Sequence, residues 1–132
     1  MATPFLIIDG YNLMHAAGIA RRRYAQGDMQ KCRNELELHV ASLLSATALK
    51  RTTIVYDAFN SPGDDQRVFH RRGLKVVFAP QGQDADGEIE RQLNAHSAPR
   101  QVIVVSSDHR LHRAARRRRA RCVDSGDFLN DL

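Results

Sequence analysis

Four short apolar runs along the chain predict four β-strands. "FLII" ends at Asp9, and "TTIVYDA", "LKVVFAP" and "QVIVVSSD" follow it at intervals along the sequence. Continuous apolar runs of this length are typical of strands that are covered on both faces, and β-branched side chains favour extended backbone. The expected strands are residues 4–8, 52–57, 75–79 and 101–106.

Helical patterns separate these runs. Over residues 28–51, apolar side chains recur at steps of three and four, which predicts one long amphipathic helix. A second helix is expected over residues 84–98, where Ile89 and Leu93 have helical spacing, and a third over residues 109–120. Because strands and helices alternate, the chain is expected to form a parallel sheet with helices on both faces.

The length and composition favour one soluble globular domain over residues 1–132. The chain has 132 residues, of which 42% are hydrophobic and 27% charged, a balance unlike that of disordered proteins. No apolar run approaches the roughly 20 residues of a membrane-spanning helix, and no signal peptide is evident. We therefore expect a cytoplasmic protein without a membrane partner. The loosest segments should be residues 18–27 and 59–66.

The basic residues are clustered, and most of them are arginine. The net charge is +5, and "RRR" at residues 21–23, "RR" at 71–72 and "RRRRAR" at 116–121 carry much of it. Arginine presents a planar set of donors that suits phosphate, so the clusters suggest nucleic acid as a partner, although each could be only a solvated basic face. The side chains expected to hold an RNA backbone are Arg21, Arg22, Arg116 and Arg117.

Acidic residues fall where the predicted strands end. Strand ends carry Asp9, Asp57 and Asp108, and the helix after the third strand begins among Asp84, Asp86, Glu88 and Glu90. The carboxyl ends of parallel strands share one edge of a sheet, which is the usual ligand site of such folds. Crowded carboxylates repel one another, and a hard divalent cation with oxygen ligands relieves that repulsion. The pattern therefore predicts a Mg²⁺ or Mn²⁺ site.

Some of these acids also have a structural interpretation. Asp108 could be a helix N-cap, Asp86 and Glu88 could complement a helix dipole, and Asp57 could begin a turn. Asp9 is the hardest to explain in this way, because "DGYN" shows no obvious cap and is expected to lead into a loop. The metal hypothesis depends on several acids meeting at one edge.

Four segments together resemble the YacP-like NYN domains of the PIN-like ribonuclease group. They are "IIDGYNLMHAAG", "TIVYDA", "VVFAPQGQDADGEIE" and "VIVVSSD", in the expected order over nearly the whole chain. The resemblance implies a Rossmann-like three-layer α/β/α sandwich with a central parallel sheet. It also implies metal-dependent endonucleolytic cleavage of RNA.

The resemblance also implies residue roles. Asp9, Asp86 and Asp108 would be catalytic metal ligands, Asn12 would be their polar companion at the catalytic site and would contact substrate, and Asp57 would complete the metal site at its rim.

This chain departs from the pattern of the family at two positions. Gly87 replaces the second aspartate of the usual Ala-Asp-Asp segment, and His112 stands where related domains often carry a further acid. Asp124 or Asp127 could replace the missing acid if the last strand returns to the same edge.

Other polar and aromatic side chains could contribute to RNA binding. Ser107 is a candidate substrate-binding donor, Tyr11 or Phe59 could stack on a base, and His15 could approach the rim. The resulting hypothesis is an endoribonuclease. The alternative is an RNA- or ribosome-binding module that keeps the fold with weak or no catalytic activity.

Overall fold

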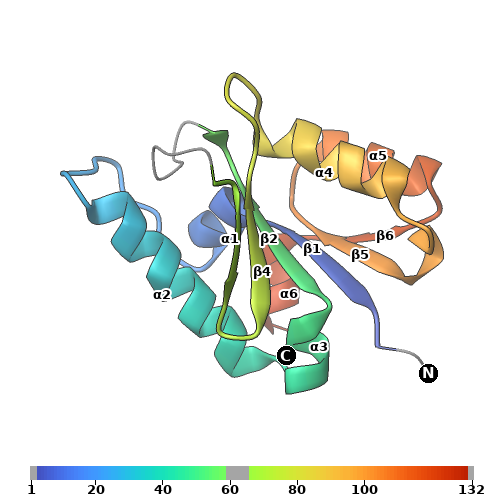
Figure 1. Cartoon of the computed structure of the whole chain (residues 1–132), viewed down its shortest axis with the longest axis horizontal. Helices are drawn as coiled ribbons and strands as arrows, with labels where there is room; N and C mark the ends of the chain where they lie inside the picture. The colour runs from blue at the N-terminus through green and yellow to red at the C-terminus, as the bar shows by residue number, and fades with distance from the viewer. Residues whose placement is uncertain (1–2, 59–65, 131–132) are drawn as a thin grey trace.

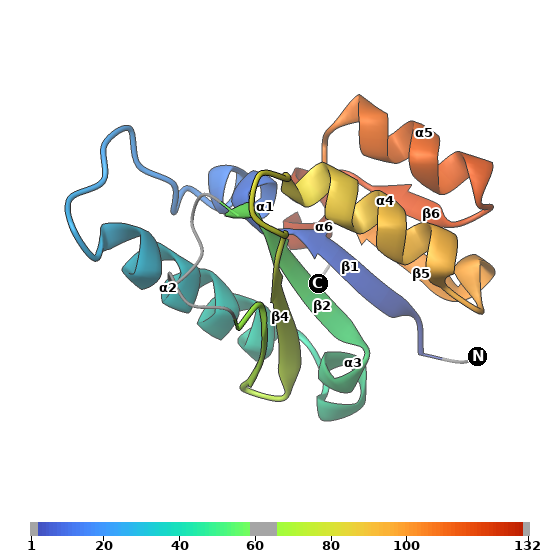
Figure 2. The ribbon, with the colours of Figure 1, turned by 45° about the horizontal axis from the view of Figure 1, so that its top comes forward.

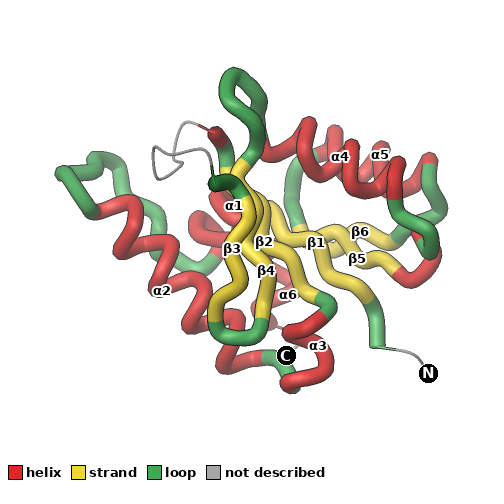
Figure 3. The backbone as a smooth tube through the Cα atoms, in the orientation of Figure 1, coloured by secondary structure: helices red, strands yellow, loops and turns green. Residues whose placement is uncertain are grey.

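A six-stranded sheet forms the centre of the computed structural model, which describes residues 3–58 and 66–130 (Figure 3). The strand order is β3-β4-β2-β1-β5-β6. Every neighbouring pair is parallel except β3 and β4, which are antiparallel. The strands are β1 (Phe5–Asp9), β2 (Thr52–Tyr56), β3 (Val68–Arg71), β4 (Leu74–Phe78), β5 (Val102–Val105) and β6 (Arg121–Val123).

Helices cover both faces of the sheet (Figure 1). The helices are α1 (Gly10–Ala16), α2 (Asp28–Leu43), α3 (Ala46–Lys50), α4 (Ala85–Ala95), α5 (His109–Arg117) and α6 (Ser125–Asn130), with a 3₁₀ turn at Pro99–Gln101. Figure 2 shows α4 and α5 on one side of the sheet and α2 on the other. The described helices include none with the length and apolar character needed to cross a bilayer.

Two hydrophobic cores hold these three layers together. On one face, Leu36 and Val40 of α2 pack against strand side chains that include Ile54 and Phe78. On the other face, Ile89 of α4 belongs to the core that includes Ile7, Val55, Val104 and Leu111. Both faces of the central strands are therefore buried, which explains why their sequences read as continuous apolar runs. The predicted three-layer α/β/α class is confirmed.

The four predicted strands are present within one or two residues of their expected ends, but the single helix over residues 28–51 is wrong. The backbone of Leu44 is extended, with φ −113° and ψ 150°. Ser45 then begins a new helix, since its hydroxyl accepts a hydrogen bond from the backbone N–H of Ala48 at 3.1 Å. Apolar periodicity continues through this break because both helices pack on the same core.

The antiparallel edge of the sheet was not predicted. β3 and β4 form a hairpin in which Arg71 faces Leu74, so only Arg72 and Gly73 make the turn. Both have positive φ, 53° and 85°, as a type I′ turn requires. The sheet is therefore mostly parallel rather than wholly parallel.

The expectation that "DGYN" leads into a loop is also wrong. Asp9 is the N-cap of α1, and its Oδ1 accepts a hydrogen bond from the backbone N–H of Asn12 at 3.4 Å. Gly10 permits this abrupt change from strand to helix, because a Cβ at that position would lie 2.5 Å from Cε1 of Tyr56. As expected, residues 18–27 are largely irregular, whereas most of the 59–66 segment lies outside the described residues.

Candidate active site

A cavity of about 300 Å³ opens at the carboxyl ends of the parallel strands. The residues that line it come from the ends of β1 and β2, from α1, and from the starts of α4 and α5. They are Asp9, Tyr11, Asn12, His15, Asp57, Asp84, Ala85, Asp86 and Asp108. The structure therefore brings Asp9, Asp57, Asp86 and Asp108 together at one edge, as the sequence pattern predicts. We call this space the acidic cavity.

Three helices begin at the acidic cavity, each with an aspartate as its N-cap. Asp9 caps α1, Asp84 Oδ1 accepts from the N–H of Gly87 in α4 at 2.8 Å, and Asp108 Oδ1 accepts from the N–H of Arg110 in α5 at 2.8 Å. The positive ends of the helix dipoles favour negative charge there. Capping and lining the cavity are therefore compatible roles for the same side chain.

Asp57 also contacts a helix start. Its Oδ1 accepts a hydrogen bond from the backbone N–H of Ala85 at 2.7 Å, which ties the end of β2 to the first turn of α4. Asp57 thus fixes the position of the segment that carries Asp86.

Burial changes the acidity of Asp9. The residue is only 6% exposed, and its Oδ2 accepts a hydrogen bond from the hydroxyl of Ser106 at 3.1 Å. Burial raises the pKa of Asp9 to about 6, and the neighbouring charges of Asp57 and Asp108 act in the same direction. The folded chain thus holds a proton on Asp9 more strongly than an exposed carboxylate would.

Asp86 and Asp108 form a hydrogen-bonded pair with opposite shifts. Burial first, and then the hydrogen bond to Asp108 and the nearby acidic charges, raise the pKa of Asp86 to about 7. The pKa of Asp108 is lowered, chiefly because the backbone N–H of Arg110 donates to it. When the pair carries one proton, that proton therefore resides mainly on Asp86.

Asn12 is held through its carboxamide oxygen. This oxygen accepts hydrogen bonds from the backbone N–H of Ser107 at 3.0 Å and from the hydroxyl of Ser125 at 2.6 Å. The amide nitrogen is then the atom of Asn12 that can donate into the acidic cavity. Ser107 does not line the cavity; its hydroxyl accepts from the backbone N–H of Ser125 at 3.3 Å.

Two buried serines that position the site were not predicted. Ser106 donates to Asp9 and accepts from the backbone N–H of Asp108 at 3.1 Å, so it joins β1 to the start of α5. Ser125 binds Asn12 from a position 113 residues further along the chain. A polar residue directly after the apolar run "VIVV" was the available signal for Ser106, whereas no local pattern indicates Ser125.

Asp124 and Asp127 do not join the acidic cavity. β6 does return parallel to β5, but Asp124, which follows it, lies 3.1 Å from Nε2 of His112 and is not part of the cavity lining. Asp127 lies exposed on α6. Neither residue therefore takes the place of the acids that are absent at Gly87 and His112.

The other predicted contacts are distributed around the site. Tyr11 and His15 both line the acidic cavity and contact each other edge to face, with ring centroids 4.6 Å apart. The approach of His15 to the rim is thus confirmed. Phe59 lies outside the described residues.

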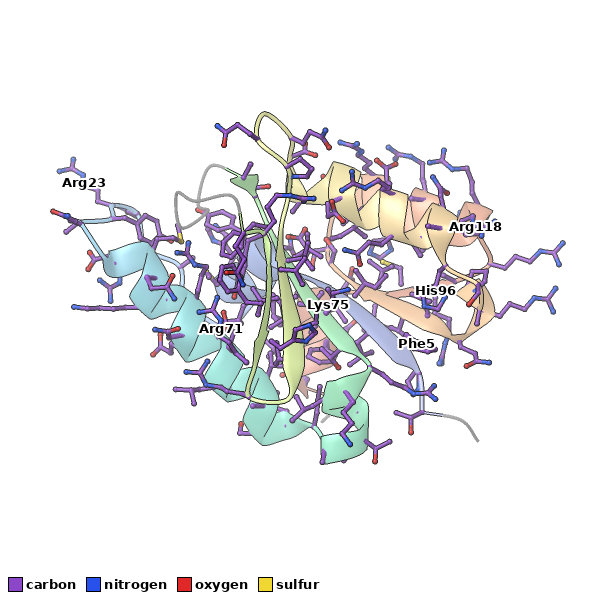
Figure 4. All side chains as sticks on the ribbon, viewed as in Figure 1. Phe5, Arg23, Arg71, Lys75, His96 and Arg118 are labelled. Atoms are coloured by element: carbon purple, nitrogen blue, oxygen red, sulfur yellow. The ribbon has the colours of Figure 1, made fainter. Side chains whose placement is uncertain are left out.

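The arginine clusters at residues 21–23 and 116–121 lie apart from each other, whereas Arg71 and Arg72 pair with the buried Glu37. Arg21 is paired with Asp28 at 3.1 Å and Arg117 with Glu90 at 3.8 Å, while Arg22 and Arg116 are exposed. Figure 4 shows Arg23 and Arg118, from these two clusters, at opposite ends of the molecule. The two clusters therefore form separate basic surfaces at opposite ends of the molecule.

The chemistry of the cavity suits a hard divalent cation. Its donors are carboxylate and carboxamide oxygens, which Mg²⁺ and Mn²⁺ prefer. The pKa values of Asp9 and Asp86 are raised chiefly by burial and further by the neighbouring carboxylates, and a bound cation would favour the ionised form of both. In residues 3–58 and 66–130, no three His, Cys, Asp or Glu side chains are already gathered tightly enough to hold one metal ion. The donor types therefore fit a metal, and the side chains would have to close around it.

The mostly parallel sheet and its two helical layers define an α/β domain with the PIN-like fold, and the acidic cavity lies at its strand ends. The family model of the YacP-like NYN domain matches residues 6–132, and the chain belongs to this family of PIN-like ribonucleases. Nucleases of this group act on RNA and generally use divalent metals.

Solved structures of Rae1 (YacP) from Bacillus subtilis share the fold. One is 24% identical with a TM-score of 0.74 and covers 96% of this chain and 72% of that chain. The structure of a single-residue variant of Rae1 is 24% identical with a TM-score of 0.73 and covers 97% of this chain and 74% of that chain. No curated protein sequence matches this chain significantly.

Proposed function

We propose that this protein is a metal-dependent endoribonuclease and that the acidic cavity is its active site. The observation that carries the proposal is the meeting of Asp9, Asp57, Asp86 and Asp108 in one cavity, where burial and crowding raise the pKa values of Asp9 and Asp86. Membership of a PIN-like ribonuclease family supports RNA as the substrate.

Asp9, Asp86 and Asp108 would hold Mg²⁺ or Mn²⁺, with Asp57 at the rim. When bound, such an ion polarises a phosphodiester and lowers the pKa of a coordinated water. Asn12 donates from its amide nitrogen to a phosphate oxygen, and Ser107 and Ser125 fix the orientation of its side chain. Asp86, whose pKa is about 7, exchanges a proton with its surroundings at neutral pH.

Arginine side chains outside the cavity would hold the RNA backbone. Arg22 and Arg116 are exposed, and Arg21 and Arg117 keep donors free beside their ion pairs. Tyr11 at the cavity offers a ring on which a base can stack.

Cleavage of a fluorophore-quencher RNA tests the proposal. The parent protein should cleave single-stranded RNA with Mn²⁺ or Mg²⁺ and not with EDTA. Asp9→Asn should reduce the cleavage rate by orders of magnitude, since it removes a ligand of the ion, while RNA binding measured in EDTA is retained. Asp127→Asn removes an exposed acid outside the cavity and is the matched control. Equal rates in the two variants would contradict the assignment of Asp9.

The second candidate is an RNA- or ribosome-binding module with weak or no catalytic activity. Gly87 and His112 favour it, because they remove two acids from the family pattern, and His112 is instead bonded to Ser106 and Asp124. Such a module would bind RNA equally with and without metal, and no divalent ion would produce cleavage. The RNA assay therefore separates the two candidates.

A further inference from the structure

A second cavity, of about 420 Å³, lies on the face of the sheet that carries α4. Its strand residues include Thr53 of β2 and Lys75 and Val77 of β4, and α4 contributes Glu88 and Gln92. The remaining residues of the lining are Phe5, Leu6, Ile7, Arg51, Arg67, Val68, Ala95 and His96. We call this space the basic groove. Figure 4 shows Lys75 near the centre of the molecule, and Phe5 and His96 beside each other near the end of α4.

Three cations of the basic groove are free of ion pairs. Within the described ranges, Arg51, Arg67 and Lys75 have no carboxylate at salt-bridge distance. The one acid of the lining, Glu88, is paired with Arg91 and accepts a hydrogen bond from Gln92 at 3.0 Å. The groove therefore presents net positive charge.

Backbone contacts hold the two arginines in place. Arg51 Nη1 donates to the carbonyl oxygen of Thr3 at 2.9 Å, and Arg67 Nη1 donates to that of Phe78 at 3.1 Å. Each guanidinium retains further donors, because an arginine carries five N–H groups. Such anchored cations suit an anionic ligand.

An aromatic pair stands at one end of the groove. The rings of Phe5 and His96 meet edge to face with centroids 4.8 Å apart, and the guanidinium of Arg51 lies 4.6 Å from the centroid of Phe5. Both rings are only partly buried. Partly exposed aromatic rings next to cations are a combination by which proteins bind single-stranded nucleic acid.

The basic groove and the acidic cavity share α4. Ala85 and Asp86 line the acidic cavity, while Glu88, less than a turn further along the helix, already lines the groove. From Glu88 to His96 the groove follows the helix for about 12 Å, at 1.5 Å per residue. A strand that leaves the acidic cavity along α4 therefore enters the groove.

We propose that the basic groove binds a single-stranded RNA segment that flanks the phosphate held at the acidic cavity. Arg51, Arg67 and Lys75 contact its phosphates, and a base packs on the Phe5–His96 pair. The RNA must be single-stranded there, because a paired and stacked base exposes no face to Phe5. For the identity of its ligand, this inference rests on the proposed function.

A pair of charge reversals tests the groove. The probe is a fluorescein-labelled oligouridylate of about twelve nucleotides, and binding is measured by anisotropy in EDTA over a range of salt concentrations. Lys75→Glu should weaken binding about tenfold and lower the slope of log affinity against log salt by about 0.7 for each phosphate that the variant no longer neutralises. Lys31→Glu, an equal charge change at an exposed site on α2, should change affinity by less than about twofold.

The aromatic contact has an independent readout. Oligouridylate that carries 4-thiouridine should crosslink to the peptide that contains Phe5. Phe5→Leu keeps an apolar side chain, and it should abolish that crosslink and bind about five- to tenfold more weakly. Equal effects of Lys75→Glu and Lys31→Glu on RNA affinity, together with no crosslink at Phe5, would overturn the proposal that the groove binds RNA. The cations of the groove would then suit another anionic partner, such as an acidic protein surface.

The results distinguish a failure of the proposed RNA-binding groove from a failure of the proposed nuclease activity. If the parent cleaves RNA and Lys75→Glu binds normally, the groove is wrong and the active site stands. If no metal supports cleavage and Lys75→Glu still weakens RNA binding, the groove binds RNA as proposed, but the protein is an RNA-binding module and the nuclease proposal is wrong.

Discussion

The carboxyl group of Asp9 serves both folding and the candidate site. It caps α1, accepts a hydrogen bond from Ser106, and lies in a cavity with four other aspartates. These hydrogen bonds favour the ionised form, but burial outweighs them and raises its pKa to about 6. The ionised form that a metal would bind is therefore less favourable in the metal-free protein than it is for an exposed carboxylate.

Asp9→Asn should stabilise the metal-free protein, and the gain should depend on pH. Below about pH 4, Asp9 is protonated in the folded and unfolded states alike. Between about pH 4 and pH 6, only the unfolded chain releases the proton, so the parent loses stability as pH rises. The loss levels off above the folded pKa of about 6, at about 2–3 kcal/mol.

Thermal melts in EDTA from pH 4 to 7.5 measure this effect. The melting temperature of Asp9→Asn should rise above that of the parent as pH increases, whereas Asp127→Asn should follow the parent. A variant that is less stable than the parent at pH 7 would show that Asp9 is chiefly a structural hydrogen-bonding residue.

The sequence predicted which acids meet, and it treated N-capping and metal binding as competing explanations for Asp108. Asp108 and Asp84 show that a capping carboxylate can also line the cavity, because the first turn of each helix lies where that helix meets the cavity. Ser125 could not be predicted, since its bond to Asn12 joins residues 113 positions apart.

Ion pairs around the buried Glu37 link α2 to the β3–β4 hairpin. Glu37 is fully buried, and it accepts from the hydroxyl of Tyr56 at 3.0 Å and lies 3.5 Å from Arg71 and 3.2 Å from Arg72. The guanidinium of Arg33 lies 5.8 Å from the ring centroid of Tyr56. Glu37 is therefore the carboxylate that balances the buried positive charge.

Glu37→Gln should destabilise the fold by about 3 kcal/mol, at the lower end of the range for breaking a buried ion pair, because it leaves the buried Arg33 and the partly buried Arg71 without a nearby carboxylate. Tyr56→Phe removes one neutral donor and should cost about 1 kcal/mol. Urea unfolding followed by circular dichroism compares the two variants. Similar losses of unfolding free energy in the two variants would show that the Tyr56–Glu37 hydrogen bond, and not the charge of Glu37, holds α2 in place.

Elements were predictable where burial is two-sided. β1, β2, β4 and β5 have apolar runs because most of their residues are buried, whereas β3 alternates exposed and half-buried residues over only four positions. Its clearest signal was the turn pair Arg72 and Gly73. α1 was missed because Asp9, which ends a strand, also begins that helix.

Metal binding should couple the acidic cavity to the stability of the entire domain. Only the folded state assembles the cavity, so Mn²⁺ at 100 times its dissociation constant should stabilise the parent by about 2.7 kcal/mol. The gain should be larger at pH 8 than at pH 6, because protons on Asp9 and Asp86 must leave before the metal binds, and their pKa values are about 6 and about 7.

Paired melts with and without Mn²⁺ at the two pH values provide the measurement. Asp9→Asn should gain much less from the metal than the parent does, while Lys31→Glu should gain as much. Equal stabilisation of the parent and Asp9→Asn would place the metal outside the acidic cavity.

The strand order also determines when the acidic cavity can form during synthesis. β1 precedes the other described strands in the sequence, yet it lies between β2 and β5 in the sheet, and Ser106, whose hydroxyl donates a hydrogen bond to Asp9, is 97 residues further along the chain. A nascent chain that ends before β5 contains Asp9, Asp57 and Asp86 but lacks Ser106 and Asp108. A translation product that stops before β5 therefore carries most of these acids without the assembled cavity, so the proposed RNA cleavage would require the chain to be made at least as far as the start of α5.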